Sequence, residues 1–142
     1  MGKSLTLSMG IKMKLCDGKI YIFWLILWSL FSVAALVGGE VYGLYDKLYW
    51  WDVLLHTLAG YMLYMTVTSF HKDPSFLGVF LIGCVVANVI VLWEVFEFFV
   101  DQYFDMSMQD DLNDTMEDIL VGKLGCFSAV LYREYKLKIL GG

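Results

Sequence analysis

The sequence has little of what a soluble domain or an interdomain linker needs. It contains one proline, no low-complexity stretch and no run rich in glycine and serine, so nothing divides its 142 residues into separate units. Charged residues make up only 18% of the chain. Hydrophobic residues make up 59%, well above the roughly 45–50% typical of soluble domains. These values exclude an ordinary soluble protein and predict a single membrane domain over residues 1–142.

The chain also lacks the short motifs of several enzyme classes. It has no phosphate-binding loop, no nucleophile elbow, no HExxH and no CxxC. Its three cysteines, Cys16, Cys84 and Cys126, have no metal-type spacing, so we expect them to be reduced packing residues. The net charge is −5 and the basic residues form no extended face, which argues against nucleic acid as a partner.

Four apolar segments approach the ~20 residues that a helix needs to cross a membrane. None alternates with the period of two that a membrane β-barrel strand requires. We therefore predict an all-α integral membrane protein, in which four transmembrane helices pack as a bundle over about residues 20–39, 51–70, 76–100 and 116–132.

The basic residues predict the orientation of this bundle. They precede the first segment, lie in the short turn between the second and third, and follow the fourth: Lys3, Lys12, Lys14, Lys19, Lys72, Arg133, Lys136 and Lys138. By the positive-inside rule, both termini are expected in the cytoplasm. The loop over residues 101–115 has five aspartates and no base, and is expected outside. We expect a multi-pass protein of the cell membrane, in bacteria the cytoplasmic membrane.

Acids and one histidine lie near the predicted outer ends of these helices. Asp52, His56 and Gly60 are spaced i, i+4 and i+8, so they share one face of the second helix. Taken alone, Asp52 could be a helix cap and His56 a hydrogen-bonding partner of a neighbouring helix. Glu94 and Glu97 lie one turn apart within an aromatic stretch, where two carboxylates repel unless a cation or a shared proton lies between them. Charges inside a membrane are costly and mostly functional.

The fourth segment carries two acids and two glycines on one face: Asp114, Asp118, Gly122 and Gly125. Asp114 or Asn113 could cap this helix, with Glu117 completing a capping box. Capping does not explain Asp118, which is one turn deeper. The glycines predict that another helix approaches closely.

Three helices are thus expected to bring carboxylates and one imidazole to the same depth. One arrangement that would stabilise them is a divalent metal ion of unknown identity, bound by His56, Glu94, Glu97, Asp114 and Asp118. Glu97 would then be a ligand or base and His56 a ligand or acid, with Asp52 beside them. The other arrangement is a network of hydrogen bonds and shared protons. Lys123 lies at the depth of Glu94 and could pair with it.

The position of this site favours a cell-envelope protein that acts on or binds a lipid or lipid-linked molecule. If it is an enzyme, which the sequence leaves open, metal-assisted hydrolysis of an ester or phosphoester is the simplest reaction. One alternative is a proton or ion transporter or a small oligomeric channel, because intramembrane acids also suit a proton relay. Another is a non-catalytic subunit that forms a homo-oligomer or binds another membrane protein.

Three motifs occur in a fixed order: Trp51-Asp52-x3-His56-x3-Gly60, Trp93-Glu94-x2-Glu97 and Asp114-Thr115-x2-Asp118-x3-Gly122-x2-Gly125. In these motifs the chain resembles small bacterial membrane proteins of the YjdF-like family (domain of unknown function 2238). More distantly, it is similar to VanZ-like proteins, which are linked to glycopeptide resistance. No established reaction comes with the family. The resemblance therefore implies a site rather than an activity, and it groups Asp52, His56, Glu94, Glu97, Asp114 and Asp118 as one functional set.

Overall fold

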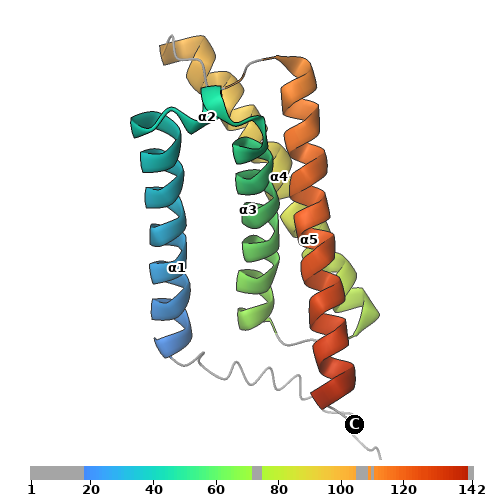
Figure 1. Cartoon of the computed structure of the whole chain (residues 1–142). Coiled ribbons are helices and arrows are strands. Elements are labelled where there is room, and N and C mark those ends of the chain that lie inside the picture. The colour runs from blue at the N-terminus through green and yellow to red at the C-terminus, as the bar shows by residue number, and fades with distance from the viewer. Residues whose placement is uncertain (1–17, 72–74, 105–108, 110, 141–142) are drawn as a thin grey trace, which may run out of the picture.

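The computed structural model describes residues 18–71, 75–104, 109 and 111–140, and every regular element in these ranges is a helix. The elements are α1 (Gly18–Leu36), a short π-helix η1 (Val37–Val41), α2 (Leu44–Lys47), α3 (Tyr49–Phe70), α4 (Phe76–Phe104) and α5 (Leu112–Leu140). The four long helices lie roughly along one axis and reverse direction from each to the next (Figure 1). The expectations for Lys3, Lys12, Lys14, Cys16 and Lys72 lie outside the described residues.

Three helical segments in the described part of the chain are long and apolar enough to cross a membrane. They are Lys19–Gly39, Tyr49–Phe70 and Phe76–Phe104. The predicted all-helical membrane class is therefore confirmed. Helix α5 is 29 residues long, as α4 is, but it carries more charge. It is not among the three segments.

Two helices extend beyond the ends predicted from hydropathy. Helix α4 continues to Phe104, past the predicted span 76–100, and α5 runs from Leu112 to Leu140, past both ends of the predicted span 116–132. For α5, the helix begins before its apolar stretch because a side chain caps its first turn. Oδ1 of Asp111 accepts hydrogen bonds from the backbone N–H groups of residues 113 and 114, which starts α5 before its apolar part.

Helices α3 and α5 run in the same direction and form the closest pair in the bundle (Figure 1). Their backbones touch where the glycines lie. A Cβ atom at Gly60 would overlap the carbonyl oxygen of Gly122, and one at Gly125 would overlap the carbonyl oxygen of Thr57. This is the close approach that the glycines predict. It brings His56 and Asp118, each one turn before a glycine of the pair, to the same level.

An apolar cluster lies below this contact. It consists of Tyr64, Ile82, Val86, Ile90, Cys126 and Ala129, contributed by α3, α4 and α5. Cys126 is buried within it and Cys84 is half-buried, and both are free, in agreement with their predicted packing role. The cluster fixes the three helices against one another beneath the polar residues.

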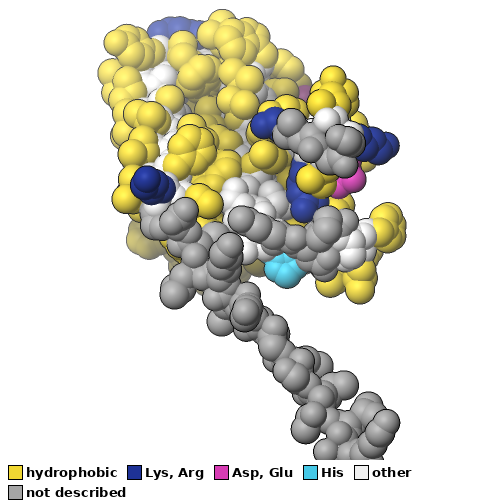
Figure 2. Space-filling view, turned by 90° about the horizontal axis from the view of Figure 1, so that it is seen from below, with side chains coloured by type: hydrophobic (Ala, Val, Ile, Leu, Met, Phe, Trp, Pro, Cys, Tyr) yellow, Lys and Arg dark blue, Asp and Glu magenta, His cyan; other side chains and the backbone are white. Residues whose placement is uncertain are grey.

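Helix α1 is attached to α3 by two tryptophans in its lower half. Nε1 of Trp24 donates to Oγ of Ser69 at 2.9 Å, and Nε1 of Trp28 donates to Oγ1 of Thr66 at 3.1 Å. Most other side chains of α1 are exposed. Hydrophobic side chains cover much of the molecule seen from below (Figure 2), as expected where lipid surrounds the helices.

Candidate functional site

The buried face of α4 changes from apolar to acidic near its upper end. Ile82, Val86 and Ile90 are buried at every fourth position, and Glu94 takes the next position on the same face with only 3% of its surface exposed. Within the described part of the chain, neither carboxylate oxygen of Glu94 has a hydrogen-bond partner. A buried carboxylate without a hydrogen bond is costly, so this position needs a functional explanation.

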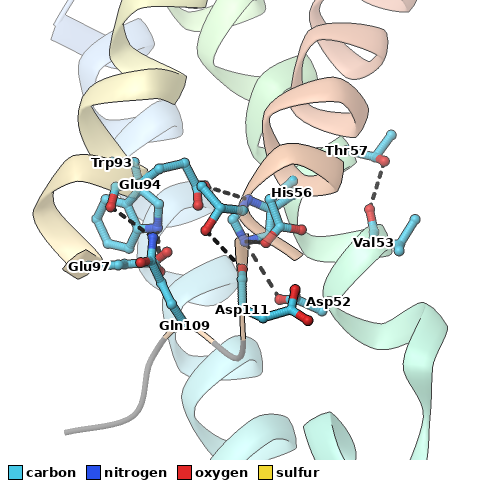
Figure 3. Close-up of polar contacts among 11 residues, drawn as sticks. Asp52, Val53, His56, Thr57, Trp93, Glu94, Glu97, Gln109 and Asp111 are labelled. Carbon is cyan, nitrogen blue, oxygen red and sulfur yellow. Dashed lines mark hydrogen bonds and ion pairs between the residues drawn. The ribbon is translucent and has the colours of Figure 1, made fainter. Parts of the chain in front are cut away.

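His56 lies among three carboxylates that come from three helices (Figure 3). Its Nε2 atom is 3.6 Å from Oδ1 of Asp52 on α3 and 3.8 Å from Oδ2 of Asp118 on α5. Its Nδ1 atom is 3.6 Å from Oε1 of Glu94 on α4. The imidazole therefore presents one nitrogen to two aspartates and the other nitrogen to the buried glutamate.

Asp52, His56 and Asp118 form a group that could hold a metal ion. Each offers one ligand atom, and the three atoms lie within 4.8 Å of one another. One imidazole nitrogen with two carboxylate oxygens suits a divalent transition metal such as zinc, manganese or iron. The donor set thus fits a metal, and it includes Asp52, which the sequence placed beside the ligands rather than among them.

Two other predicted ligands are close by but outside this group. Glu97 is buried, with 8% of its surface exposed. Its Oε1 accepts a 2.7 Å hydrogen bond from Nε1 of Trp93 on its own helix. Asp114 is half-buried in the first turn of α5, one turn above Asp118. Neither residue contributes an atom to the group that could hold a metal.

The structure does not pair Lys123 with Glu94. Lys123 is exposed, and within the described residues no ion pair joins the two side chains. Lys123 lies five residues beyond Asp118, about 7.5 Å below the level at which His56 contacts Asp118 and Glu94. A Cβ atom at Gly122 would meet Ile90 of α4, and one further residue turns the side chain by about 100° around the helix, to the exposed surface.

The capping interpretation of Asp114 is also wrong. Asp111, which precedes the first residue of α5, supplies the capping oxygen. Glu117 completes no capping box and instead accepts a hydrogen bond from the hydroxyl of Tyr49 at the start of α3. An aspartate just before a helical stretch is a known N-cap signal, so Asp111 could have been found from the sequence.

Gln109 was missed by the sequence analysis. Its backbone N–H donates to Oδ2 of Asp101 at 2.9 Å, and its side-chain Nε2 donates to the carbonyl oxygen of Glu94 at 3.0 Å (Figure 3). These bonds fold the end of the connection between α4 and α5 back over Glu94. The second contact joins residues 15 apart, and no periodic pattern announces it.

A groove of about 560 Å³ lies between the upper parts of α4 and α5. Glu94 lines it together with apolar residues from both helices, among them Val91, Val95 and Ile119. Val91 and Val95 are 38% and 43% exposed, so the groove opens on the outer surface of the bundle. The buried glutamate can therefore be reached from the side.

Comparisons with known proteins place the chain in a family without naming a reaction. Residues 13–138 match the family model described as "Predicted membrane protein (DUF2238)". The chain is 31% identical to a protein of Thermotoga maritima described as uncharacterized, over 69% of this chain and 56% of that protein, so it spans little more than half of the relative's length. No solved structure matches the chain. The more distant likeness to VanZ-like proteins stays a prediction. Since the family model covers nearly the whole sequence, this multi-pass membrane protein belongs to the DUF2238 family.

Proposed function

We propose that this is a cell-envelope membrane protein whose outward-facing site binds a divalent metal ion and acts on a lipid or lipid-linked molecule. The observation that carries the proposal is the arrangement around His56, where three helices each contribute a carboxylate within 4 Å of one imidazole. Such a concentration of acids inside a membrane protein is costly unless a cation compensates it.

The proposal includes a topology in which α5 is a fourth span and both termini are cytoplasmic. At 1.5 Å per residue, the 29 residues of α5 extend about 43 Å, enough to cross the bilayer beside α3. The described basic residues at the lower ends of α1 and α5 are Lys19, Arg133, Lys136 and Lys138. By the positive-inside rule that end faces the cytoplasm, so the acidic site faces outward.

A reporter fused after residue 109 tests this orientation. We expect a periplasmic or external reporter to be active there, and a reporter at residue 140 to be active only in its cytoplasmic form. The same cytoplasmic result at both positions would contradict a membrane crossing by α5, which is the one helix between them.

Within the site, we assign the metal to the Nε2 side of His56, together with Asp52 and Asp118. Glu94 then lies on the Nδ1 side. A carboxylate that accepts a hydrogen bond from the far nitrogen of a metal-binding histidine holds the ring in one tautomer and orientation. Glu94, expected from the sequence to be a ligand, is better placed as a positioning residue.

A bound divalent ion would supply Lewis acidity for the hydrolysis of an ester or phosphoester. Glu97 stays the proposed base, since its carboxylate is buried and is held by Trp93. Asp114 lies one turn above Asp118, toward the outside, where it can meet an arriving head group or ion.

The routes into the site favour a lipid substrate over a transported ion. The groove between α4 and α5 gives access from the side, where the outer leaflet would lie. Below His56, the backbone contact between Gly60 and Gly122 leaves no room for a path between α3 and α5. A homo-oligomer or a partner membrane protein stays a prediction.

Metal analysis of the purified full chain tests the proposal. We expect the native protein to retain a divalent ion and His56→Ala and Asp118→Ala to lose it. Glu117→Gln is the matched control, because Glu117 precedes Asp118 on the same helix but bonds to Tyr49, and it should keep the ion. Glu97→Gln should also keep the ion while losing any hydrolysis of added lipid extract.

Two results would overturn this proposal. One is a native protein that holds no divalent ion even after incubation with zinc or manganese. The other is equal metal content in all of the variants. A liposome ion flux that depends on Glu97 would favour the transporter in its place.

A further inference from the structure

The groove beside Glu94 continues downward along the same two helices. A second groove of about 380 Å³ lies between the lower parts of α4 and α5, lined by Ala87, Phe127 and Val130 among other mainly apolar residues. On α4, positions 87, 91 and 95 follow one another at intervals of four, so both grooves lie on one face of that helix. Together they form a seam, polar above and apolar below, that crosses much of the height of the bundle.

The upper groove carries acids and no base among the residues that line it. Its three carboxylates belong to Glu94, Asp101 and Asp111. Asp101 accepts the backbone N–H of Gln109, and Asp111 caps α5, so both already have donors. Glu94 has only 3% of its surface exposed, and neither of its oxygens has a hydrogen-bond partner among the described residues; His56 approaches one of them, Oε1, at 3.6 Å. The donor that fits this carboxylate is a small cation with N–H groups.

Lys123 stands beside the seam, between the residues that line its upper and lower parts. Ile119 lines the upper groove and Phe127 lines the lower one, and Lys123 lies four residues from each, on the same face of α5. His56 contacts both Glu94 and Asp118, so these two acids lie at one level, and Lys123 is five residues, or about 7.5 Å, further down α5. An exposed ammonium therefore lies on the outer side of the seam, below the level of the buried carboxylate on its inner side.

We propose that this seam binds a zwitterionic lipid that carries a primary amine and a phosphate. The amine donates to Glu94, the phosphate accepts from Lys123, and an acyl chain occupies the apolar lower groove. This assignment gives the buried carboxylate of Glu94 a hydrogen-bond donor and gives the exposed ammonium of Lys123 an anion. It rests on the proposed function in one respect, namely that the site receives a lipid, and it does not require that the metal be present.

Lipid retention in detergent tests the inference. The full chain is treated with a chelator, equilibrated with equal amounts of phosphatidylethanolamine, phosphatidylcholine and phosphatidylglycerol, and analysed by native mass spectrometry. We expect phosphatidylethanolamine to be retained over the other two lipids by about tenfold, as a charge-assisted hydrogen bond allows. Glu94→Gln should abolish this preference, and Lys123→Met should reduce the retention of all three lipids.

A pair of tryptophan variants tests the seam itself. Val95 lines the upper groove, whereas Val89 lines neither groove. Both residues lie on α4 and are similarly exposed, at 43% and 41%. Val95→Trp should reduce lipid retention several-fold, and Val89→Trp should leave it unchanged. Equal effects of the two substitutions would overturn the assignment of the seam.

The remaining outcomes separate this inference from the proposed function. Equal retention of the three lipids by the wild-type chain, or a preference that survives in Glu94→Gln, would overturn the inference even if the metal is bound. His56→Ala should lose the metal and keep the lipid preference. A chain that binds no metal but still prefers phosphatidylethanolamine would leave the inference standing and remove the metal from the proposed function.

Discussion

Gly60→Ala is expected to lower the free energy of unfolding by about 1–3 kcal/mol, the usual range for overpacking a tight contact. The loss should occur although alanine favours a helix more than glycine does. The added Cβ would overlap the carbonyl oxygen of Gly122, and a backbone atom cannot move aside as a flexible side chain can. Helices α3 and α5 would have to separate. Thermal unfolding of the purified protein in detergent measures the change.

Gly83→Ala is the matched control for this substitution. Gly83 lies within α4, and a Cβ built there meets nothing within 4 Å. Its stability should equal that of the wild type or exceed it by up to about 1 kcal/mol, the helix-propensity gain of alanine over glycine. If the two variants lost the same stability, close packing would not be the role of Gly60.

A divalent metal ion is expected to raise stability by about 2.7 kcal/mol when its free concentration is one hundred times the dissociation constant. The ion would compensate the acids around His56, which repel one another without it. Asp118→Asn should lose this response. Without metal, it should be no less stable than the wild type, since it removes one of the repelling charges. Melting curves with and without a chelator measure both effects.

Glu117→Gln again serves as the control, and its melting temperature should respond to metal as the wild type does. A metal response that persists in Asp118→Asn would show that the ion binds elsewhere. A metal-free Asp118→Asn protein that is strongly destabilised would indicate that Asp118 has a structural hydrogen bond rather than a ligand role.

The residues around His56 could be predicted because helix geometry fixes both their depth and their face. The spacing of Asp52 and His56 places them on one stripe, and the order of the helices brings Glu94 and Asp118 to the same end. The structure places these four residues together. Hydropathy and the order of charged residues along the chain predict at which end of the bundle each residue lies, because a membrane restricts each helix to a few orientations.

The direction of each side chain around its helix was harder to predict. Lys123 was expected to pair with Glu94, yet it follows Gly122, whose Cβ position faces Ile90 of α4, and its own side chain is exposed. Periodicity also does not separate the roles of Glu94 and Glu97, because residues three apart differ by only about 60° around a helix. Their roles depend on the neighbours, His56 for the first and Trp93 for the second.

The connection between α4 and α5 was the least predictable part. Gln109 and Asp111 act through a few hydrogen bonds to the end of α4 and to the start of α5, and neither belongs to a periodic pattern. Such contacts form only when the helices have already brought the two ends of the connection together. The sequence therefore predicts which helices carry the site more readily than what covers it.

The two tryptophan bonds between α1 and α3 decide how α1 is turned about its own axis. For an apolar helix in a bilayer, lipid and protein are nearly equivalent neighbours, so apolar contact alone gives little preference for one rotation over another. An indole N–H has no water to bond with there, which makes the hydroxyls of Ser69 and Thr66 its available partners. Trp24 and Trp28, one turn apart, thus set the face of α1 that meets the lipid, although few other side chains of α1 are buried.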